Sequence, residues 1–253
     1  MKKGSISASR NSSKADTRCS SQEVECQNCG LDPICSILDY AEEESGVPDG
    51  VLLRRRPVSR GETIFRKEDP FHSLFAVKSG SFKTYVPRFD HTDQVVGFHL
   101  AGEMLGCEGM ASEVYPYTAR ALENSSVCEL RLEKLTGAGR PVEALQKGII
   151  ELLGKEVAFS HELIASMVHQ TSEQRVAGFL LSISSRLDRR AMPSSEFNMG
   201  MSRSDIGNFL GLAGETVSRV LTKFQKQGMI RLKHKRVTIL DGAAVQHLAD
   251  GLD

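Results

Sequence analysis

The segment MSRSDIGNFLGLAGETVSRVLTKFQKQGMI, residues 201–230, carries the clearest structural signal in the sequence. Either Ser202 or Ser204 can cap a short helix, GLAG at 211–214 can form a tight turn, and Gly228 suits the position after a second helix. The apolar residues fall on one face of each helix: Ile206, Phe209 and Leu210, then Val217, Val220, Leu221 and Phe224. A short helix, a glycine-containing turn and a longer helix are typical of a helix-turn-helix.

The residues after this segment predict a basic wing. IRLKHKRVTIL, residues 230–240, reads as two β-runs around a basic turn. Residues 201–240 hold eight Lys or Arg against two acids, a local charge of +6, whereas the whole chain balances 32 basic with 32 acidic residues. A basic C-terminal module can neutralise DNA phosphates. The side chains that we assign to the DNA backbone are Arg203, Lys223, Lys233 and Lys235.

Three side chains of the second helix are candidates for base recognition. Glu215, Ser218 and Arg219 are spaced i, i+3 and i+4, on one face near the helix N-terminus. Arginine can bond guanine O6 and N7, glutamate can accept from cytosine N4, and serine can contact either kind of edge. The alternative is a solvated face on which Glu215 and Arg219 pair with each other. The helix-turn-helix and the wing together favour base readout.

The region from about 51 to 133 has a different pattern, with short β-like runs separated by glycines. The runs are ETIF, SLFAV, SFKTYV, QVVGFHL and VCELRL, and the glycines are Gly61, Gly80, Gly97 and Gly102. Many short strands at fairly regular spacing predict a small barrel or a double-sheet roll. The fold class is therefore α+β, with a β-roll before the DNA-binding module.

A long helix is predicted to follow Pro141 and to reach about His169. One apolar seam has the 3, 4, 3, 4, 3 spacing of paired helices: Ile150, Leu153, Val157, Ser160, Ile164 and Met167. A second stripe contains Ile149, Leu152, Phe159 and Leu163. One stripe can pack on its own domain and the other on a second copy, although a single broad face buried in one core is the alternative. We favour a homodimer helix, which Ser160 would weaken and make switchable.

Cysteines are concentrated near the N-terminus, in CQNCGLDPIC at residues 26–35. Cys26, Cys29 and Cys35 have the spacing C-x2-C-x5-C, with Cys19 upstream and Cys107 and Cys128 downstream. Neither a secretory signal nor an apolar run of membrane-spanning length is visible, so we expect a cytoplasmic protein without membrane association. There, clustered cysteines more often bind metal or sense redox state than form structural disulfides. Zinc, an iron–sulfur cluster and a redox disulfide all remain open, and Cys128 could also be a core residue.

The roll, the long helix and the winged helix-turn-helix with ETVSR at 215–219 resemble the CRP/FNR family of dimeric transcription regulators. The E-x-x-S-R form resembles the FNR branch, whose members recognise inverted repeats of the TTGAT type. The resemblance implies that Glu215 and Arg219 read a G·C pair and that Ser218 reads the adjacent thymine. Gly214 stands where the cAMP-responsive branch usually carries another arginine. Double-stranded DNA, a second copy of the chain and RNA polymerase are the partners that it implies.

The same resemblance suggests what the sensor reads. GEML at 102–105 is similar to the start of a cyclic-nucleotide cassette, but Tyr117 and Thr118 stand where its arginine and hydroxyl pair are expected. Without that arginine, a buried phosphate lacks its charge partner. FNR-type oxygen sensors instead hold a 4Fe–4S cluster with C-x2-C-x5-C and a distant cysteine in a V-C-E stretch. This implies the ligand set Cys26, Cys29, Cys35 and Cys128.

The sequence therefore predicts an oxygen-responsive global regulator of anaerobic gene expression and not an enzyme. The cluster would promote dimerisation and DNA binding, and its oxidation would switch the protein off. The alternative is a regulator of the same family switched by a small ligand or by cysteine redox chemistry without iron. The expected divisions are a disordered N-terminus (1–18), a cysteine-rich cluster-binding segment (19–45), a cyclic-nucleotide-binding-like β-roll (46–140), a dimerisation helix (141–171) and a winged helix-turn-helix domain (172–253).

Overall fold

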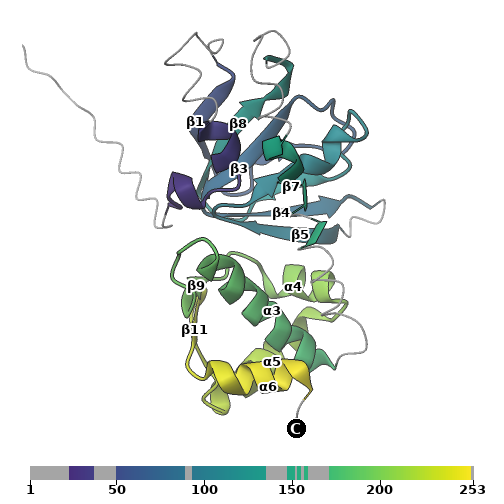
Figure 1. The fold of residues 1–253 in the computed structure, drawn as a ribbon. Helices are drawn as coiled ribbons and strands as arrows, with labels where there is room; N and C mark the ends of the chain where they lie inside the picture. Colours follow the sequence, from purple (N-terminus) through teal and green to yellow (C-terminus); the bar gives the residue numbers. More distant parts are fainter. Residues whose placement is uncertain are drawn as a thin grey trace, which may run out of the picture.

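The chain is described from a computed structural model, which defines residues 23–36, 50–88, 93–134, 147–151, 153–154, 157–158 and 171–251. The disordered N-terminus predicted for 1–18 and Cys19 lie outside these residues, as does most of the predicted dimerisation helix. Figure 1 shows two parts, a β-roll and a mainly helical unit that contains the C-terminus. None of the helices in the described ranges combines the length and the apolar character that crossing a lipid bilayer requires.

The roll consists of two antiparallel four-stranded sheets. One sheet has the order β1 (Leu52–Val58), β8 (Ser125–Arg131), β3 (Ser73–Ser79) and β6 (Met104–Leu105). The other has the order β2 (Thr63–Phe65), β7 (Thr118–Ala121), β4 (Ser81–Val86) and β5 (Gln94–Leu100). An apolar cluster fills the space between them, and in it the rings of Phe65 and Tyr115 stack with centroids 3.9 Å apart. This confirms the predicted double-sheet roll.

Three strands of the roll were not predicted. β1 reads LLRRRPV, in which three arginines and a proline remove the alternation of apolar and polar residues that identifies a half-buried strand. β6 has only two residues, and β7 reads TARA, which is too short and too small-sided to give a pattern. The five predicted runs correspond to β2, β3, β4, β5 and β8.

The helical unit begins with α3 (Ser172–Asp188), whose first turn is closed by a capping box between Thr171 and Gln174. The helix-turn-helix follows as α4 (Arg203–Leu210) and α5 (Gly214–Lys226). Ser202, rather than Ser204, caps α4, and its hydroxyl accepts from the Asp205 amide. Gly228 follows α5 with φ 76°, the left-handed conformation expected just after a helix. The wing is formed by β10 (Ile230–Lys233) and β11 (Arg236–Ile239), and α6 (Gly242–Asp250) ends the described chain.

One strand of this unit differs from what its sequence indicates. The stretch AMPSSEFNMG, residues 191–200, reads as a loop leading into the helix-turn-helix, but it contains β9 (Glu196–Asn198), which pairs with β11 and completes a three-stranded sheet of order β10-β11-β9. The strand has a single buried side chain, Phe197, so its sequence carries too little periodicity to show it. What holds the strand is the partner strand about forty residues later, which a local pattern cannot reveal.

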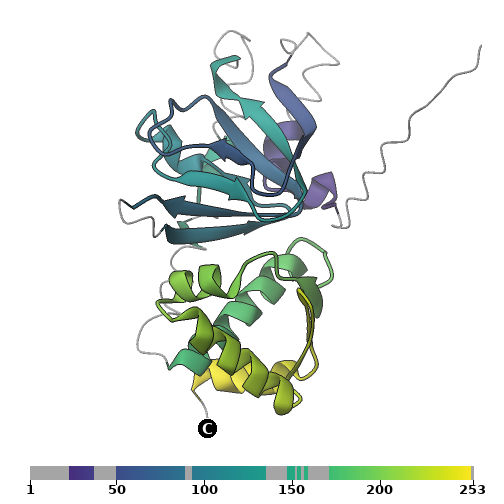
Figure 2. The same ribbon diagram turned by 180° about the vertical axis from the view of Figure 1, so that it is seen from behind.

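The roll and the helical unit share one apolar core, as the close approach of β5 to α3 and α4 in Figure 2 suggests. Phe98 of β5 lies edge-on to Phe179 of α3 and to Phe209 of α4, with ring centroids 5.9 and 5.1 Å apart. Val95, Leu100 and Leu122 of the roll belong to the same cluster. The DNA-binding unit is therefore packed directly against the β5 side of the roll.

Candidate DNA interface and cysteine site

The three predicted base-reading side chains lie on the exposed face of α5, near its N-terminus. The side chains of Arg219 and Glu215 are 82% and 87% exposed, with Arg219 Nη2 3.8 Å from Glu215 Oε2. An ion pair between two side chains this exposed is weak. Both side chains can therefore give up this contact and bind the edge of a DNA base instead. The Ser218 hydroxyl donates to the Gly214 carbonyl at 3.0 Å.

The opposite face of α5 is fixed by burial. It carries Val217, Val220, Leu221 and Phe224, all buried, as the apolar spacing predicted. The angle between α4 and α5 depends on Gly207, because a Cβ on this residue would lie 2.5 Å from the Leu212 carbonyl oxygen of the turn. Backbone can approach backbone here only without a side chain. The exposed face of α5 is thus presented by a tightly determined helix-turn-helix.

The four predicted phosphate contacts do not share one environment. Lys233 and Lys235 are exposed on the wing. Lys223 is exposed too, but its Nζ lies 2.6 Å from Glu173 Oε1 of α3. Arg203 is half-buried beside Met199, and burial lowers the pKa of its guanidinium. A shallow hollow on α5 is lined by Ser218, Arg219, Thr222, Lys223 and Lys226.

The cysteine segment lies against the β1-β8-β3-β6 sheet (Figure 1). It contains the short 3-10 helix η1 (Cys26–Asn28) and a helical turn at 32–36. Leu31 and Ile34 are fully buried in one cluster with Leu74 and Leu130 of the sheet. The Gly30 amide donates to the Gly102 carbonyl at 2.8 Å. Two apolar anchors and backbone hydrogen bonds therefore fix the loop between Cys26 and Cys35.

Cys29, Cys35 and Cys128 are partly buried at the border of this cluster, whereas Cys26 is exposed and Cys107 is buried within it. Burial raises the pKa of the Cys29 thiol, and the neighbouring Cys128 raises it further, while Arg190 and Lys78 act in the opposite direction. None of the five described cysteines is joined to another of them in a disulfide. Within the described ranges, no three His, Cys, Asp or Glu side chains are gathered closely enough to hold a metal ion.

The donor set nevertheless suits an iron–sulfur cluster. Iron–sulfur clusters are held by soft thiolates, and here the four candidate ligands are cysteines that form no disulfide with one another. Three of them border one apolar surface, and Cys29 and Cys128 come from segments about a hundred residues apart. Cys128 lies near Cys29 of the N-terminal segment, at the border of the same apolar cluster. Cys19, which is not part of the C-x2-C-x5-C spacing, lies outside the described residues.

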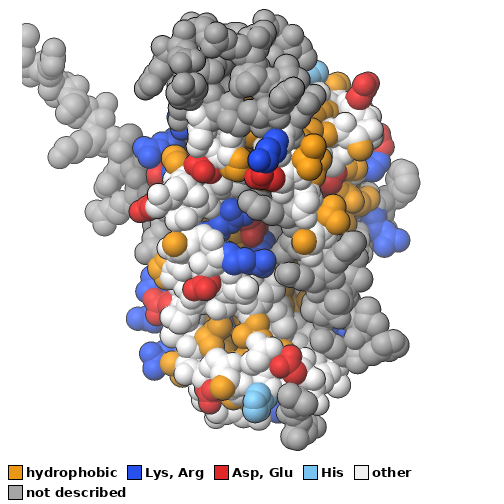
Figure 3. Space-filling view, viewed as in Figure 1, with side chains coloured by type: hydrophobic (Ala, Val, Ile, Leu, Met, Phe, Trp, Pro, Cys, Tyr) orange, Lys and Arg blue, Asp and Glu red, His pale blue; other side chains and the backbone are white. Residues whose placement is uncertain are grey.

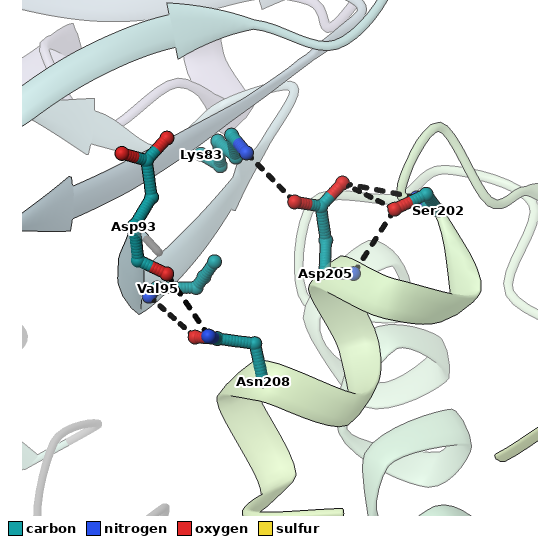
Figure 4. Close-up of polar contacts among 6 residues, drawn as sticks. All are labelled: Lys83, Asp93, Val95, Ser202, Asp205 and Asn208. Carbon is teal, nitrogen blue, oxygen red and sulfur yellow. Dashed lines mark hydrogen bonds and ion pairs between the residues drawn. The ribbon is translucent and has the colours of Figure 1, made fainter. Parts of the chain in front are cut away.

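Polar contacts between the roll and the DNA-binding unit were not predicted at all. In Figure 4, Lys83 Nζ lies 2.7 Å from Asp205 Oδ1, and Asn208 accepts from the Val95 amide at 2.7 Å and donates to the Asp93 carbonyl at 2.9 Å. Burial alone would raise the pKa of Asp205, but hydrogen bonds from Lys83 and Ser202 outweigh it and hold the pKa below its ordinary value. No local sequence signal connects these residues, because each contact spans more than a hundred positions.

A second contact involves the GEML sequence. Arg186 of α3 is buried, donates to the Phe98 carbonyl, and forms a two-point ion pair with Glu103, in which Nε lies 2.7 Å from Oε1. Burial would raise the pKa of Glu103, but the charge and hydrogen bonds of Arg186 lower it overall. Glu103 therefore joins the two units, and its carboxylate is already occupied. On the face shown in Figure 3, basic and acidic side chains lie close together near the middle of the molecule.

The predicted dimer seam is described only in part. The side chains of Ile150 and Val157 are 68% and 55% exposed in the single chain. Leu153, assigned to the same seam, is partly buried and packs with Ile149 against the cysteine-segment cluster. Ser160, Ile164 and Met167 lie outside the described residues.

A β-roll joined to a winged helix-turn-helix defines a DNA-binding transcription regulator. Comparison with family models agrees, since residues 174–248 match the Crp-like helix-turn-helix domain and residues 55–138 match the cyclic nucleotide-binding domain. The chain is 39% identical over 229 residues to the transcriptional activator protein anr of Pseudomonas aeruginosa, covering 90% of this chain and 94% of that protein. It is 35% identical over 226 residues to the fumarate and nitrate reduction regulatory protein of Escherichia coli K12, covering 89% and 90% of the two chains.

The chain belongs to the CRP/FNR family of transcription regulators, in the FNR branch. This confirms the predicted family, the DNA-binding function and the expectation that the protein is not an enzyme. Among solved structures, FixK2 from Bradyrhizobium japonicum matches with a TM-score of 0.67 and 26% identity over 78% of this chain and 98% of its own. TTHB099 from Thermus thermophilus, with a TM-score of 0.62 and 22% identity over 77% and 96% of the two chains, shares the fold.

Proposed function

We propose that this protein is a cytoplasmic, oxygen-responsive regulator of anaerobic gene expression that binds TTGAT-type inverted repeats as a homodimer and acts with RNA polymerase. The observation that carries the proposal is the cysteine arrangement. Cys26, Cys29 and Cys35 lie in one segment anchored on the roll, and Cys128 lies beside Cys29. Transcriptional activators among its relatives supply the wider context.

Cys26, Cys29, Cys35 and Cys128 would hold a 4Fe–4S cluster, which when bound supplies an oxygen-sensitive group with four thiolate ligands. The protein's own contribution is to position these thiols. Leu31 and Ile34 anchor the loop that carries three of them, and β8 carries the fourth. Ligation would tie the loop more firmly to the sheet, and loss of ligation would leave it held by its two apolar anchors and a few hydrogen bonds.

Dimerisation would use the apolar side chains that the single chain leaves in solvent. Ile150 and Val157 are large, exposed and one heptad apart, so a second copy can cover them. On the same helix, Ile149 and Leu153 contact the cluster that contains Leu31 and Ile34. The cysteine segment therefore touches the helix that would pair, and ordering the segment would favour the paired geometry. Each dimer would present two copies of α5 to successive major grooves.

Purification without oxygen, followed by iron, sulfide and zinc analysis, tests the cluster. We expect iron and acid-labile sulfide in comparable amounts, with loss of both in Cys29→Ser and Cys128→Ser. Cys19→Ser and Cys107→Ser are the matched controls and should retain the cluster. Stoichiometric zinc in a colourless protein, or a cluster lost in Cys19→Ser, would contradict the ligand set.

A binding experiment tests the readout separately. Arg219→Ala should weaken binding to a TTGAT palindrome by about 10- to 100-fold, because a bidentate contact to a base contributes about 1–3 kcal/mol. Binding to a scrambled duplex of the same length should change little. Equal affinity of the wild-type protein for both duplexes would refute base recognition by this face.

A further inference from the structure

Two basic side chains from different parts of the fold converge on the Cys26–Cys29 loop. The first is Lys78, which is only 4% exposed although it lies in β3. It stands where the pairing of β3 with β8 shifts register, between Val77 and Ser79. Such irregularities turn a side chain away from the normal alternation. Lys78 Nζ donates to the Val24 carbonyl and lies 3.8 Å from Cys26 Sγ.

The second is Arg190, which follows α3 in the DNA-binding unit. Its Nη1 donates to the Asn28 carbonyl at 3.1 Å, within η1 of the cysteine segment. The stem of the side chain crosses Gly102, where an added Cβ would meet Arg190 Cδ at 3.0 Å. The carbonyl of the same glycine accepts from Gly30. The cysteine loop, the β5–β6 turn and the end of α3 therefore meet at one point.

We infer that Lys78 and Arg190 are positioning residues for the cluster-binding loop, and that through Arg190 the DNA-binding unit is part of the cluster site. The inference rests on the proposed function and specifies how that site is regulated. It adds a direct route from the cysteines to the DNA-binding unit of the same chain, distinct from the dimer helix.

The electrostatic argument follows from burial. A lysine as buried as Lys78 is costly unless it is paired, and its described partners are a carbonyl and a thiol. Four thiolates ligating a cluster give the site net negative charge, which two adjacent cations stabilise. Both cations also donate to backbone carbonyls of the cysteine segment: Lys78 to Val24, just before the loop, and Arg190 to Asn28 within it. They therefore hold the loop in position as well as balancing its charge.

The test compares neutral and charge-conserving variants of the full-length protein purified without oxygen. The neutral variants are Lys78→Met and Arg190→Gln, the conservative ones are Lys78→Arg and Arg190→Lys, and Arg60→Gln, an exposed arginine of the roll, is the control. Iron and sulfide content, the rate at which cluster absorbance disappears in air, and the affinity for the palindrome with and without the cluster are measured for each.

We expect the neutral variants to lose cluster absorbance about tenfold faster than the wild type, as substitutions around metal ligands commonly weaken metal sites. The conservative variants should recover most of the lifetime. Arg190→Gln should also reduce the cluster-dependent gain in DNA affinity by about fivefold or more, even when its cluster is intact. Amide exchange at residues 26–30 of the metal-free protein should be faster in both neutral variants than in Arg60→Gln.

The possible results distinguish a failure of the proposed function from a failure of the inference about Lys78 and Arg190. A wild-type protein without iron and sulfide would overturn the proposed function. A wild-type cluster whose lifetime and DNA coupling are unchanged in Lys78→Met and Arg190→Gln would overturn only the inference. A loss that the conservative variants do not repair would overturn the electrostatic role.

Discussion

Asp205 closes the first turn of α4 and at the same time accepts an ion pair from Lys83 of the roll, with 2.7 Å between Oδ1 and Nζ. Its other oxygen accepts from the Ser202 hydroxyl at 2.7 Å. One carboxylate therefore stabilises a helix terminus and the contact between sensor and DNA reader (Figure 4).

Substitutions at this contact should separate its two roles. Lys83→Met removes the ion pair and the contact of Lys83 Nζ with the Tyr85 ring, 5.2 Å away, but leaves the helix cap in place. We expect it to lower the free energy of unfolding by about 1–3 kcal/mol, because Asp205 is left partly buried without its cation. Asp205→Ala should cost about 1 kcal/mol more, since it also removes the cap. Denaturant unfolding of the two single variants and of the double variant Lys83→Met/Asp205→Ala measures the coupling free energy between the two residues. Lys67→Met, whose partner Glu68 is exposed, is the control and should be unchanged.

Two glycine substitutions should have opposite effects. Gly207→Ala places a Cβ 2.5 Å from the Leu212 carbonyl, and we expect a loss of about 2 kcal/mol or more with weaker DNA binding. Gly178→Ala lies in α3 with nothing within 4 Å of the added Cβ, so it should stabilise by about 0.5–1 kcal/mol. Thermal unfolding of both variants and of the wild type measures these two changes in stability. A harmless Gly207→Ala would mean that the helix-turn-helix is looser than described.

Acid should weaken the contact between the two units through His99. Burial lowers the pKa of this imidazole, with Arg186 acting in the same direction and Glu103 and Glu108 opposing it. Because the folded pKa is below the ordinary value of about 6.5, the associated stability is present above that pH and is lost as pH falls below it. In metal-free protein, the melting temperature should fall more steeply below this pH in the wild type than in His99→Gln. Parallel curves would exclude His99 as the cause.

The wing should contribute affinity without specificity. Lys233 and Lys235 are exposed and basic, so replacing either by Ala should weaken binding to specific and scrambled DNA equally. The slope of log affinity against log salt should decrease in magnitude by about one for each lysine that contacts a phosphate. Filter binding over a salt series measures this, with Lys67→Ala as the control. A loss of affinity for the palindrome alone, with unchanged affinity for scrambled DNA, would instead assign these lysines to base or shape recognition.

The helix-turn-helix could be predicted from sequence because its information is local. The buried face of α5, the cap at Ser202 and the left-handed Gly228 are each encoded within a few residues of where they act. The joint between the units could not be predicted, because periodicity shows that Phe98 is buried but not that Phe179 and Phe209 cover it. Lys78 gave no signal for a similar reason, since a lysine within a strand normally reaches solvent.

The aromatic contact of Phe98 with Phe179 and Phe209 has a mechanical consequence. Swinging the DNA-binding unit away from the roll would return these rings to water, at a cost of about 2 kcal/mol for each ring. The roll and the DNA-binding unit are therefore expected to move as one rigid body, with little bending of the chain between them. In a dimer of such bodies, a signal would change the distance and angle between the two copies of α5, and with them the spacing of the DNA half-sites that the dimer can bind.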